Sequence, residues 1–260
     1  MISGDTSYVS LGLGGFASRQ TVTAGSSVHL AAIAVRDKAI KLGAQMLEAA
    51  EVDLELRDGS VFVKGTDRAV ALSEVARVLR GVPGYALPPG MEAGLEASFH
   101  WRTEVLAYAH SFHACEVEVD VETGNVRILR YVALQDSGRL INPMIVEGQI
   151  HGGITHGIGN ALFEFMGYDS EGQPYTATFA DYLLPAAVEV PKFEILFHES
   201  PSPLNPLGVK GVGEGGTVPV APTIMSAIDD ALIPWGVRVT SAPISPVRLL
   251  ELIEAGAHQA

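Results

Sequence analysis

The stretch from Asn205 to Gly216 constrains the fold most, because five of its last nine residues are glycine and a single acid, Glu214, lies among them. Such a run favours neither helix nor strand, and it suits a backbone that passes close to another group. From Thr217 onward, apolar residues recur at helical spacing, and Pro219 stands where a first turn tolerates proline. The sequence therefore predicts a glycine-rich loop that carries Glu214 to the start of a helix.

Glu214 has two interpretations. An acid just before a helix is stabilised by the positive end of the helix dipole, and this structural role is common. Alternatively, Glu214 is a general base, because the flanking glycines leave room for a substrate and apolar surroundings raise the proton affinity of a carboxylate toward neutrality. The spacing of the residues leaves both interpretations open.

The glycine-rich loop and the helix after it resemble the C-terminal signature of the molybdenum hydroxylases, the family of xanthine dehydrogenase, aldehyde oxidase and aerobic carbon monoxide dehydrogenase. The matching residues are Lys210-Gly211-Val212-Gly213-Glu214-Gly215-Gly216, Pro219, Ala221 and Ser226-Ala227-Ile228-Asp229-Asp230-Ala231. In that family the glutamate of this loop is the base beside the molybdenum, so the resemblance implies this role for Glu214. It also implies an α+β fold, in which mixed sheets pack with long amphipathic helices, as in the cofactor-binding domain of the aldehyde oxidase/xanthine dehydrogenase type.

A long amphipathic helix is predicted from Val28 to Met46, where apolar residues alternate at spacings of four and three, and Ser26 or Ser27 is its expected cap. A helix start that follows glycine and hydroxyl residues can bind a phosphate through its free N–H groups, although most capped helices bind nothing. In the molybdenum hydroxylases a similar segment wraps the cofactor and its phosphate. The resemblance therefore implies a cofactor-binding set made of Phe16, Ala17, Ser18, Arg19, Thr21, Thr23, Ala24, Gly25 and Ser26.

A second helix is predicted from Val146 to Leu162, and it is unusual because five glycines lie within it. Each interior glycine costs roughly 0.5–1 kcal/mol relative to alanine, so close packing or a ligand must offset them. A lone glutamine on a helix, such as Gln149, is usually exposed to solvent. However, Gly148-Gln149-Ile150-His151-Gly152-Gly153 resembles the family segment whose glutamine hydrogen-bonds the cofactor beside the metal. The resemblance implies that Gln149 binds the cofactor.

A β-hairpin is predicted around the turn Glu122-Thr123-Gly124-Asn125, since apolar and polar residues alternate on both sides of it. Cys115 lies on the apolar side, which favours a buried core thiol over a nucleophile. No metal ligand is predicted, because His151 and His156 are five residues apart and miss the spacing that places two imidazoles on one helix face. The other predicted elements are strands within 52–65, 193–197 and 237–239 and helices at 72–79 and 246–255.

Proline and glycine interrupt the chain at Val82-Pro83-Gly84 and again at Leu87-Pro88-Pro89-Gly90. We therefore expect a first lobe at residues 1–90, with the cofactor-phosphate segment and the long helix. The second lobe, residues 91–260, carries the hairpin, the glycine-containing helix and the loop of Glu214.

Composition excludes several classes of protein. A net charge of -13, with seventeen Lys and Arg residues in all, is unsuited to a nucleic-acid surface. A single cysteine excludes a disulfide, a cysteine zinc site and an iron–sulfur cluster held by this chain. No apolar run approaches the length of a membrane span, and Met1–Asp5 lacks the features of a signal peptide, so the expected location is the cytoplasm.

The resemblance runs from about residue 4 to residue 254 and matches roughly the C-terminal third of a molybdenum hydroxylase large subunit. It implies hydroxylation of an aldehyde, an N-heterocycle or a carbon monoxide-like substrate with water as the oxygen source. The implied cofactor is molybdenum-molybdopterin, the cytosine dinucleotide form included, with iron–sulfur clusters and FAD on partner chains. The implied partners are the remaining part of the large subunit, an iron–sulfur subunit and a flavin subunit, which makes this chain a piece of a split subunit or a truncated product.

Two alternatives come from other classes of protein. A non-catalytic cofactor-binding or scaffold subunit has the same sequence signals, and an anion-binding module without a metal keeps the helix-start site. Molybdenum and pterin that co-purify with the assembled chains distinguish the enzyme from both.

Overall fold

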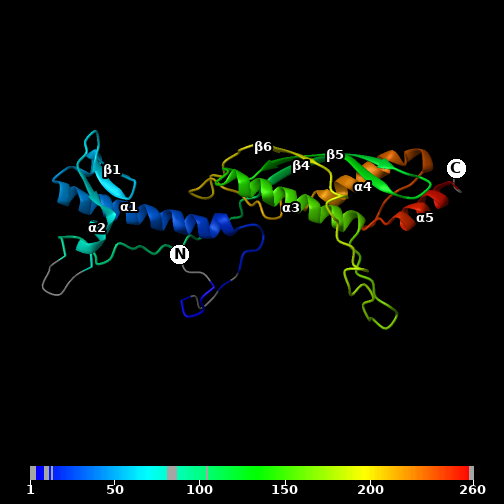
Figure 1. The fold of residues 1–260 in the computed structure, drawn as a ribbon, viewed down its shortest axis with the longest axis horizontal. Coiled ribbons are helices and arrows are strands. Elements are labelled where there is room, and N and C mark those ends of the chain that lie inside the picture. The colour runs from blue at the N-terminus through cyan, green and yellow to red at the C-terminus, as the bar shows by residue number, and fades with distance from the viewer. Residues whose placement is uncertain (1–3, 9–11, 13, 81–86, 104, 258–260) are drawn as a thin grey trace. The chain divides into compact units, whose positions relative to one another are not determined.

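The computed structural model describes residues 4–8, 12, 14–80, 87–103 and 105–257, and the chain forms two compact units (Figure 1). The first unit contains Met1–Gly12 and Thr23–Glu104, and the second contains Leu13–Val22 and Val105–Ala260. The units thus divide after residue 104, compared with the division expected near residue 90. Of the two interruptions in the sequence, Val82-Pro83-Gly84 lies outside the described residues.

The segment after residue 90 belongs to the first unit because it is bonded to two of its helices. The Nζ of Lys38 donates a hydrogen bond to the carbonyl of Gly94 at 2.6 Å, and the N–H of Gly94 donates to the carbonyl of Leu79 at 2.7 Å. Met91 and Leu95 pack against the apolar core of this unit. Helix α2 ends at Val78, and residues 91–95 then pack onto the same core.

The first unit is built on the helix α1 (Ser26–Leu47), which packs against a small sheet and the helix α2 (Leu72–Val78). The sheet is antiparallel, in the order β1 (Leu54–Arg57), β2 (Ser60–Val63) and β3 (Ala69–Ala71), and a 3-10 turn η2 (Glu51–Asp53) precedes it. The two helices and the β1–β2 pair confirm the sequence prediction, whereas β3 was not predicted. Leu42, Val61 and Leu79 form the centre of this core.

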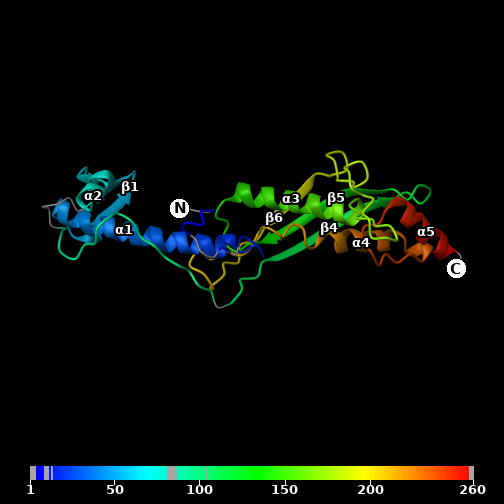
Figure 2. The same cartoon turned by 90° about the horizontal axis from the view of Figure 1, so that it is seen from below.

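The second unit is a three-stranded sheet in the order β4 (His110–Val119), β5 (Val126–Asp136) and β6 (Phe193–Phe197). β4 and β5 form the predicted hairpin, and β6 runs parallel to β5. The helices α3 (Pro143–Leu162) and α4 (Val220–Ala231) lie along one face of this sheet, as Figures 1 and 2 show. Tyr131, Ile154 and Ile224 are fully buried between the sheet and the two helices.

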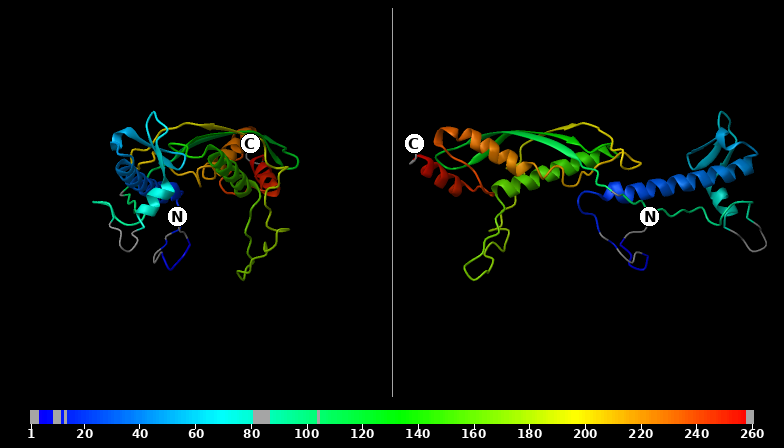
Figure 3. Two further views of the ribbon diagram at one scale, coloured as in Figure 1. Left: turned by 60° about the vertical axis from the view of Figure 1, so that its left-hand side comes forward. Right: turned by 180° about the vertical axis from the view of Figure 1, so that it is seen from behind.

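The end of the chain differs from the prediction in one element. Val237 and Val239 are buried, but they form no strand, because the N–H of Val239 is bonded to the Oδ1 of Asp229 at 2.6 Å instead of to a neighbouring strand. A 3-10 turn η3 (Ile233–Trp235) and the helix α5 (Pro246–Ala257) complete the unit. The predicted strand is therefore wrong, and the predicted last helix is confirmed. Between α3 and β6 a long loop extends away from the sheet (Figure 3).

Candidate active site

Glu214 lies in a loop that is fixed at its base by backbone pairing. The side chain of Asn205 both donates to the carbonyl of Val209 at 2.8 Å and accepts from its N–H at 3.1 Å, which closes a tight turn. Val209 forms an antiparallel bridge with Gly138, a residue that follows the end of β5. Gly138 has a φ of +65°, and a Cβ there would collide with the carbonyl of Gly208, so this crossing needs glycine.

A buried ion pair holds the next residue of the loop. The Nζ of Lys210 lies 2.6 Å from the Oδ2 of Asp136, and the two side chains are 9% and 11% exposed. Burial alone would raise the pKa of Asp136. The hydrogen bonds from Lys210 and from the backbone N–H groups of Gly138 and Ser200 outweigh that effect and hold the pKa of Asp136 below its ordinary value. The lysine of the glycine-rich loop is thus a support for the loop and does not face a ligand.

The carboxylate of Glu214 is bound by a residue 196 positions earlier in the chain. The hydroxyl of Ser18 donates to its Oε2 at 2.8 Å, and the N–H of Glu214 donates back to the same hydroxyl oxygen at 2.9 Å. Ala17 and Ser18 both have left-handed backbone angles, with φ of +52° and +53°, which is uncommon for residues other than glycine. This pair of contacts joins the predicted cofactor segment to the predicted base.

The glycines around Glu214 leave room for this contact. A Cβ on Gly211 would lie 2.8 Å from the Cβ of Ser18, and a Cβ on Gly215 would lie 2.8 Å from the Oε1 of Gln135. Gln135 is fully buried, and its Oε1 has no hydrogen-bond partner among the described residues. The glycines are thus required by close approach to neighbouring groups, as the sequence predicts.

The position of Glu214 weighs against a role as a helix-start acid. α4 begins at Val220, six residues after Glu214, and its first turn contains no acidic residue. The dipole effect is confined to the first turn of a helix. The carboxylate is exposed, so the apolar surroundings expected from the sequence are not provided by the residues that the structure describes.

The loop of Glu214 packs against the glycines of α3. A Cβ on Gly216 would lie 2.7 Å from the carbonyl oxygen of Ile150, and a Cβ on Gly153 would lie 2.8 Å from the carbonyl carbon of Gly216. Gly157 is likewise closed off by Val220 at the start of α4. Helix α3 is therefore glycine-rich on this side because a backbone and a second helix lie directly on it.

Two of the other glycines of α3 have no such neighbour. A Cβ on Gly148 or on Gly152 would meet nothing within 4 Å, and Gln149 between them is exposed, with no hydrogen bond to its side chain from the described residues. This bare stretch of helix, with one free amide, adjoins the Ile150–Gly153 turn that touches the loop of Glu214. It is open to a flat polar group that approaches a backbone closely, so these residues fit a molybdopterin cofactor.

The remaining members of the predicted cofactor set lie between Phe16 and Ser26. The guanidinium of Arg19 stacks over the ring of Phe16 at 3.9 Å, and Phe16 is 55% exposed. Thr21, Thr23, Ala24 and Gly25 lie in a π-helical turn, η1 (Thr21–Gly25), that leads directly into α1. The boundary between the two units falls inside this turn, after Val22.

The predicted cap of α1 is wrong. Gly25 stands at the N-cap position with helical angles and no side-chain cap, and the hydroxyl of Ser27 donates backward to the carbonyl of Thr23 at 3.1 Å. Because η1 continues the helix toward the N-terminus, helical geometry starts at Gln20, and the free N–H groups of the helix start lie there and not at Ser26. Ser26 is fully buried, and its hydroxyl has no hydrogen-bond partner among the described residues.

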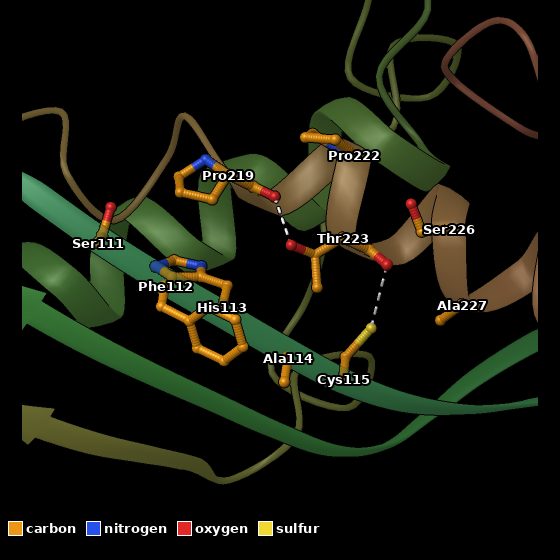
Figure 4. A pocket seen from close by; sticks show the side chains of 10 residues that line it. All are labelled: Ser111, Phe112, His113, Ala114, Cys115, Pro219, Pro222, Thr223, Ser226 and Ala227. Carbon is orange, nitrogen blue, oxygen red and sulfur yellow. Dashed lines mark hydrogen bonds between the residues drawn. The ribbon is translucent and has the colours of Figure 1, made fainter.

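Cys115 lies on β4, where its Sγ approaches the carbonyl of Thr223 at 3.5 Å (Figure 4). Burial raises the pKa of its thiol to about 11. A thiol that stays protonated at neutral pH is a poor nucleophile, which agrees with the core role predicted for Cys115.

Several residues that shape the site were not identified from the sequence. Asp136 and Gln135 stand at the end of β5, and neither was given a role in the site. Ser18 was expected to bind the cofactor, whereas its side chain binds Glu214. In the sequence Asp136 is a lone acid at the end of a buried strand, and this pattern does not predict which residue forms an ion pair with it. Contacts between residues 74 or 196 positions apart depend on the tertiary fold.

Comparison with known proteins shows the family of the chain. Residues 1–191 match the family model of the molybdopterin cofactor-binding domain. The chain is 40% identical over 250 residues to the gamma subunit of the 6-hydroxypseudooxynicotine dehydrogenase complex of Paenarthrobacter nicotinovorans, covering 96% of this chain and 31% of that protein. It is 39% identical over 247 residues to the carbon monoxide dehydrogenase large chain of Hydrogenophaga pseudoflava, covering 95% and 30%.

Solved structures give the same result. Carbon monoxide dehydrogenase from Oligotropha carboxidovorans superposes with a TM-score of 0.84 at 36% identity, over 96% of this chain and 31% of that one. Quinoline 2-oxidoreductase from Pseudomonas putida 86 also superposes with a TM-score of 0.84, at 38% identity, over 94% and 31%. The chain thus spans slightly less than a third of the length of these relatives. It belongs to the molybdenum hydroxylase family, and it carries the molybdopterin cofactor-binding domain of that family.

Proposed function

We propose that this chain is a part of the large subunit of a molybdenum hydroxylase and that Glu214 is the catalytic base. The observation that carries the proposal is the contact of Ser18 with both the carboxylate and the N–H of Glu214. It holds an exposed carboxylate on a loop whose Gly216 packs against Ile150 and Gly153 of α3, the helix that also carries Gln149. A base, a group that orients it and an open surface for a cofactor are then combined in one place.

When bound, the molybdenum cofactor supplies the two-electron redox chemistry of a hydroxylation in which water provides the oxygen atom. Glu214 accepts the proton that this oxygen must lose, at the carboxylate oxygens, and Ser18 keeps one of these oxygens oriented by donating to Oε2. The amide of Gln149 would donate a hydrogen bond to the cofactor. Lys210 and Asp136 hold the loop in place without touching substrate.

The segment from Phe16 to Ser26 is the second part of the proposed cofactor site. Ser18 supports Glu214 through its side chain, while the N–H groups of the helix start at Gln20 and Thr21 bind a phosphate group of the cofactor. Arg19 stacks on Phe16, and the two side chains together present a flat cationic surface to the cofactor. Thr23, Ala24, Gly25 and Ser26 complete the proposed set.

The electrons leave through partner chains, because the chain has one cysteine and an iron–sulfur cluster needs several. We therefore propose an assembly with the remaining part of the large subunit, an iron–sulfur subunit and a flavin subunit that carries FAD. Among the described residues, no helix is long and apolar enough to cross a membrane. The cytoplasm remains the location predicted from the sequence.

The proposed substrate is a small molecule with an electron-poor carbon, namely an aldehyde, an N-heterocycle or a carbon monoxide-like compound. The names of the relatives include a nicotine 6-hydroxylase, carbon monoxide dehydrogenases and a quinoline oxidoreductase. A non-catalytic scaffold subunit is the alternative, and it predicts an assembly without turnover.

The test is to purify the chain in its complete assembly and to measure molybdenum, pterin and the reduction of the enzyme by substrate. The proposal predicts molybdenum close to one atom per chain and bleaching of the iron–sulfur and flavin absorbance on addition of a substrate of this class. An intact assembly that lacks molybdenum would contradict it and favour the scaffold.

A further inference from the structure

A groove runs along the free edge of β4. In the described part of the chain β4 pairs with β5 on one side only, so its other edge is open. Five consecutive residues, Ser111 to Cys115, line a hollow of about 500 Å³, and α4 forms its other wall (Figure 4). Since neighbouring residues of a strand point to opposite faces, a hollow lined by all five lies along the edge of the strand and not under one face.

The wall contributed by α4 is uncharged and has small or rigid side chains. It is formed by residues at spacings of three and four, which share one face of the helix, namely Pro219, Pro222, Thr223, Ser226 and Ala227. Together with the edge of β4 it makes a channel that no Asp, Glu, Lys or Arg side chain lines. Such a channel suits an extended, uncharged stretch of polypeptide.

The two halves of β4 differ in how their open edge is protected. Natural edge strands avoid unwanted pairing by means of charged side chains and bulges. The second half of β4 has both, because Glu116 and Glu118 are carried there and the pairing with β5 is irregular between Glu116 and Val117. The first half, which lines the groove, has neither. The part of the edge that faces the groove is therefore left able to pair.

His113 supplies an independent observation. Its ring is only 8% exposed, and its Nδ1 lies 2.9 Å from the hydroxyl of Tyr131. Its Nε2 is buried and has no hydrogen-bond partner among the described residues. Burial lowers the pKa of His113 to about 4, so the ring is neutral at physiological pH. A buried nitrogen without a partner is unfavourable, so the polar groups of β4 on this side are not fully satisfied by the described residues.

We infer that an extended segment from the remaining part of the large subunit adds to β4 as a fourth strand in this groove. The inference rests on the proposed function, which makes this chain one portion of a longer subunit. The chain covers 31% and 30% of its relatives, so about two thirds of a complete subunit lies outside it and supplies the strand. Main-chain hydrogen bonds to the edge of β4 give affinity, and the uncharged α4 wall selects an apolar segment.

The added strand lies next to the loop of Glu214. Ser111, the first residue of the groove, donates its hydroxyl to the carbonyl of Gly215 at 3.2 Å. Docking of the segment therefore orders the start of β4, and with it the hydrogen bond from Ser111 to Gly215, the residue that follows Glu214. Assembly of the large subunit and placement of the base become linked through this contact.

The experiment is hydrogen–deuterium exchange on this chain, first alone and then assembled with the polypeptide that completes the large subunit. The amides of Ser111 to Cys115 that point away from β5 should exchange at least about 10-fold more slowly in the assembly. In parallel, Ser226→Trp fills the groove from the α4 side and should weaken association about 10-fold or more. Asp230→Trp is the matched control, since Asp230 is exposed on the same helix but does not line the groove.

The outcomes separate the inference from the proposed function. Association and molybdenum loading without protection of Ser111 to Cys115, or with normal affinity for Ser226→Trp, overturn the inference and leave the proposed function intact. If the amides of Ser111 to Cys115 are protected in the chain alone as strongly as in the assembly, and this protection increases with the concentration of the chain, a second copy of the chain fills the groove. That result also overturns the inference. Protection in an assembly that contains no molybdenum supports the docked strand and contradicts the proposed function.

Discussion

Breaking the ion pair between Lys210 and Asp136 should loosen the loop of Glu214. In Lys210→Met the carboxylate of Asp136 loses its charged partner while it remains 11% exposed. Removal of one partner of a buried pair costs about 3–5 kcal/mol. Asp136 keeps the N–H groups of Gly138 and Ser200, so we expect the lower end, about 3 kcal/mol, which corresponds to about a 100-fold change in a local opening equilibrium.

The assay is hydrogen–deuterium exchange of the amides of Val209 and Lys210 in the assembled enzyme. Both amides are bonded within this crossing, to Asn205 and to Ser137. They should exchange about 100-fold faster in Lys210→Met. Arg130→Met is the matched control, because Arg130 forms an equally short pair with Glu194, at 2.7 Å, but both side chains are more than half exposed.

The pH dependence follows from the direction of the pKa shift. The pKa of Asp136 is held below its ordinary value of 3.8, so its stabilising contribution is complete above that pH and is lost as the pH falls through the lower folded-state pKa. Wild-type exchange at Val209 should therefore accelerate below about pH 4. Exchange in Lys210→Met that matches wild type would refute the assignment of the loop's rigidity to this pair.

Three further outcomes follow from the contacts. Ser18→Ala leaves the Oε2 and the N–H of Glu214 without their partner, so turnover at saturating substrate should fall about 10-fold with little change in molybdenum content, and an unchanged rate would remove Ser18 from the site. His113 has a folded-state pKa of about 4, compared with 6.5 when unfolded. The free energy of unfolding should thus decrease by up to about 3 kcal/mol as the pH falls from 6.5 to 4, and this decrease should be absent in His113→Phe. Cys115, with its pKa raised from 9.0 to about 11, should react with iodoacetamide at pH 8 about 100-fold more slowly than an ordinary thiol, and rapid alkylation would contradict its burial.

The periodic elements could be predicted from the sequence because their patterns are local. The structure contains all three of the longest predicted elements, namely the helix over Val28–Met46, the hairpin around Thr123 and the helix of Val146–Leu162. Their ends lie within a few residues of the predicted ends or extend beyond them. The strand expected at 237–239 is absent because the short Val-Arg-Val pattern fits any buried segment, and among the described residues no strand pairs with it. The cap expected at Ser26 failed because the π turn before it has no clear periodic signature.

The candidate site could be predicted in its residues but not in its contacts. Glu214 and Gln149 were predicted as site residues from the resemblance of their motifs. In the structure the loop of Glu214 packs against α3, the helix that carries Gln149. The roles of Lys210 and Ser18 depend on pairings across 74 and 196 residues, which no local pattern encodes. The glycines of α3 were expected to meet close packing or a ligand. Gly153 and Gly157 meet protein, while Gly148 and Gly152 remain open.

The central claim, that Glu214 is the base, is tested most directly by Glu214→Gln in the assembled enzyme. This change keeps the shape of the side chain and its ability to accept from Ser18, but it removes the proton acceptor. Molybdenum should load normally, and rapid mixing with substrate should show bleaching of the iron–sulfur and flavin absorbance slowed by on the order of 10²–10⁴-fold. Bleaching of the loaded variant at nearly the wild-type rate would contradict the account, because Glu214 would then take no part in the reaction.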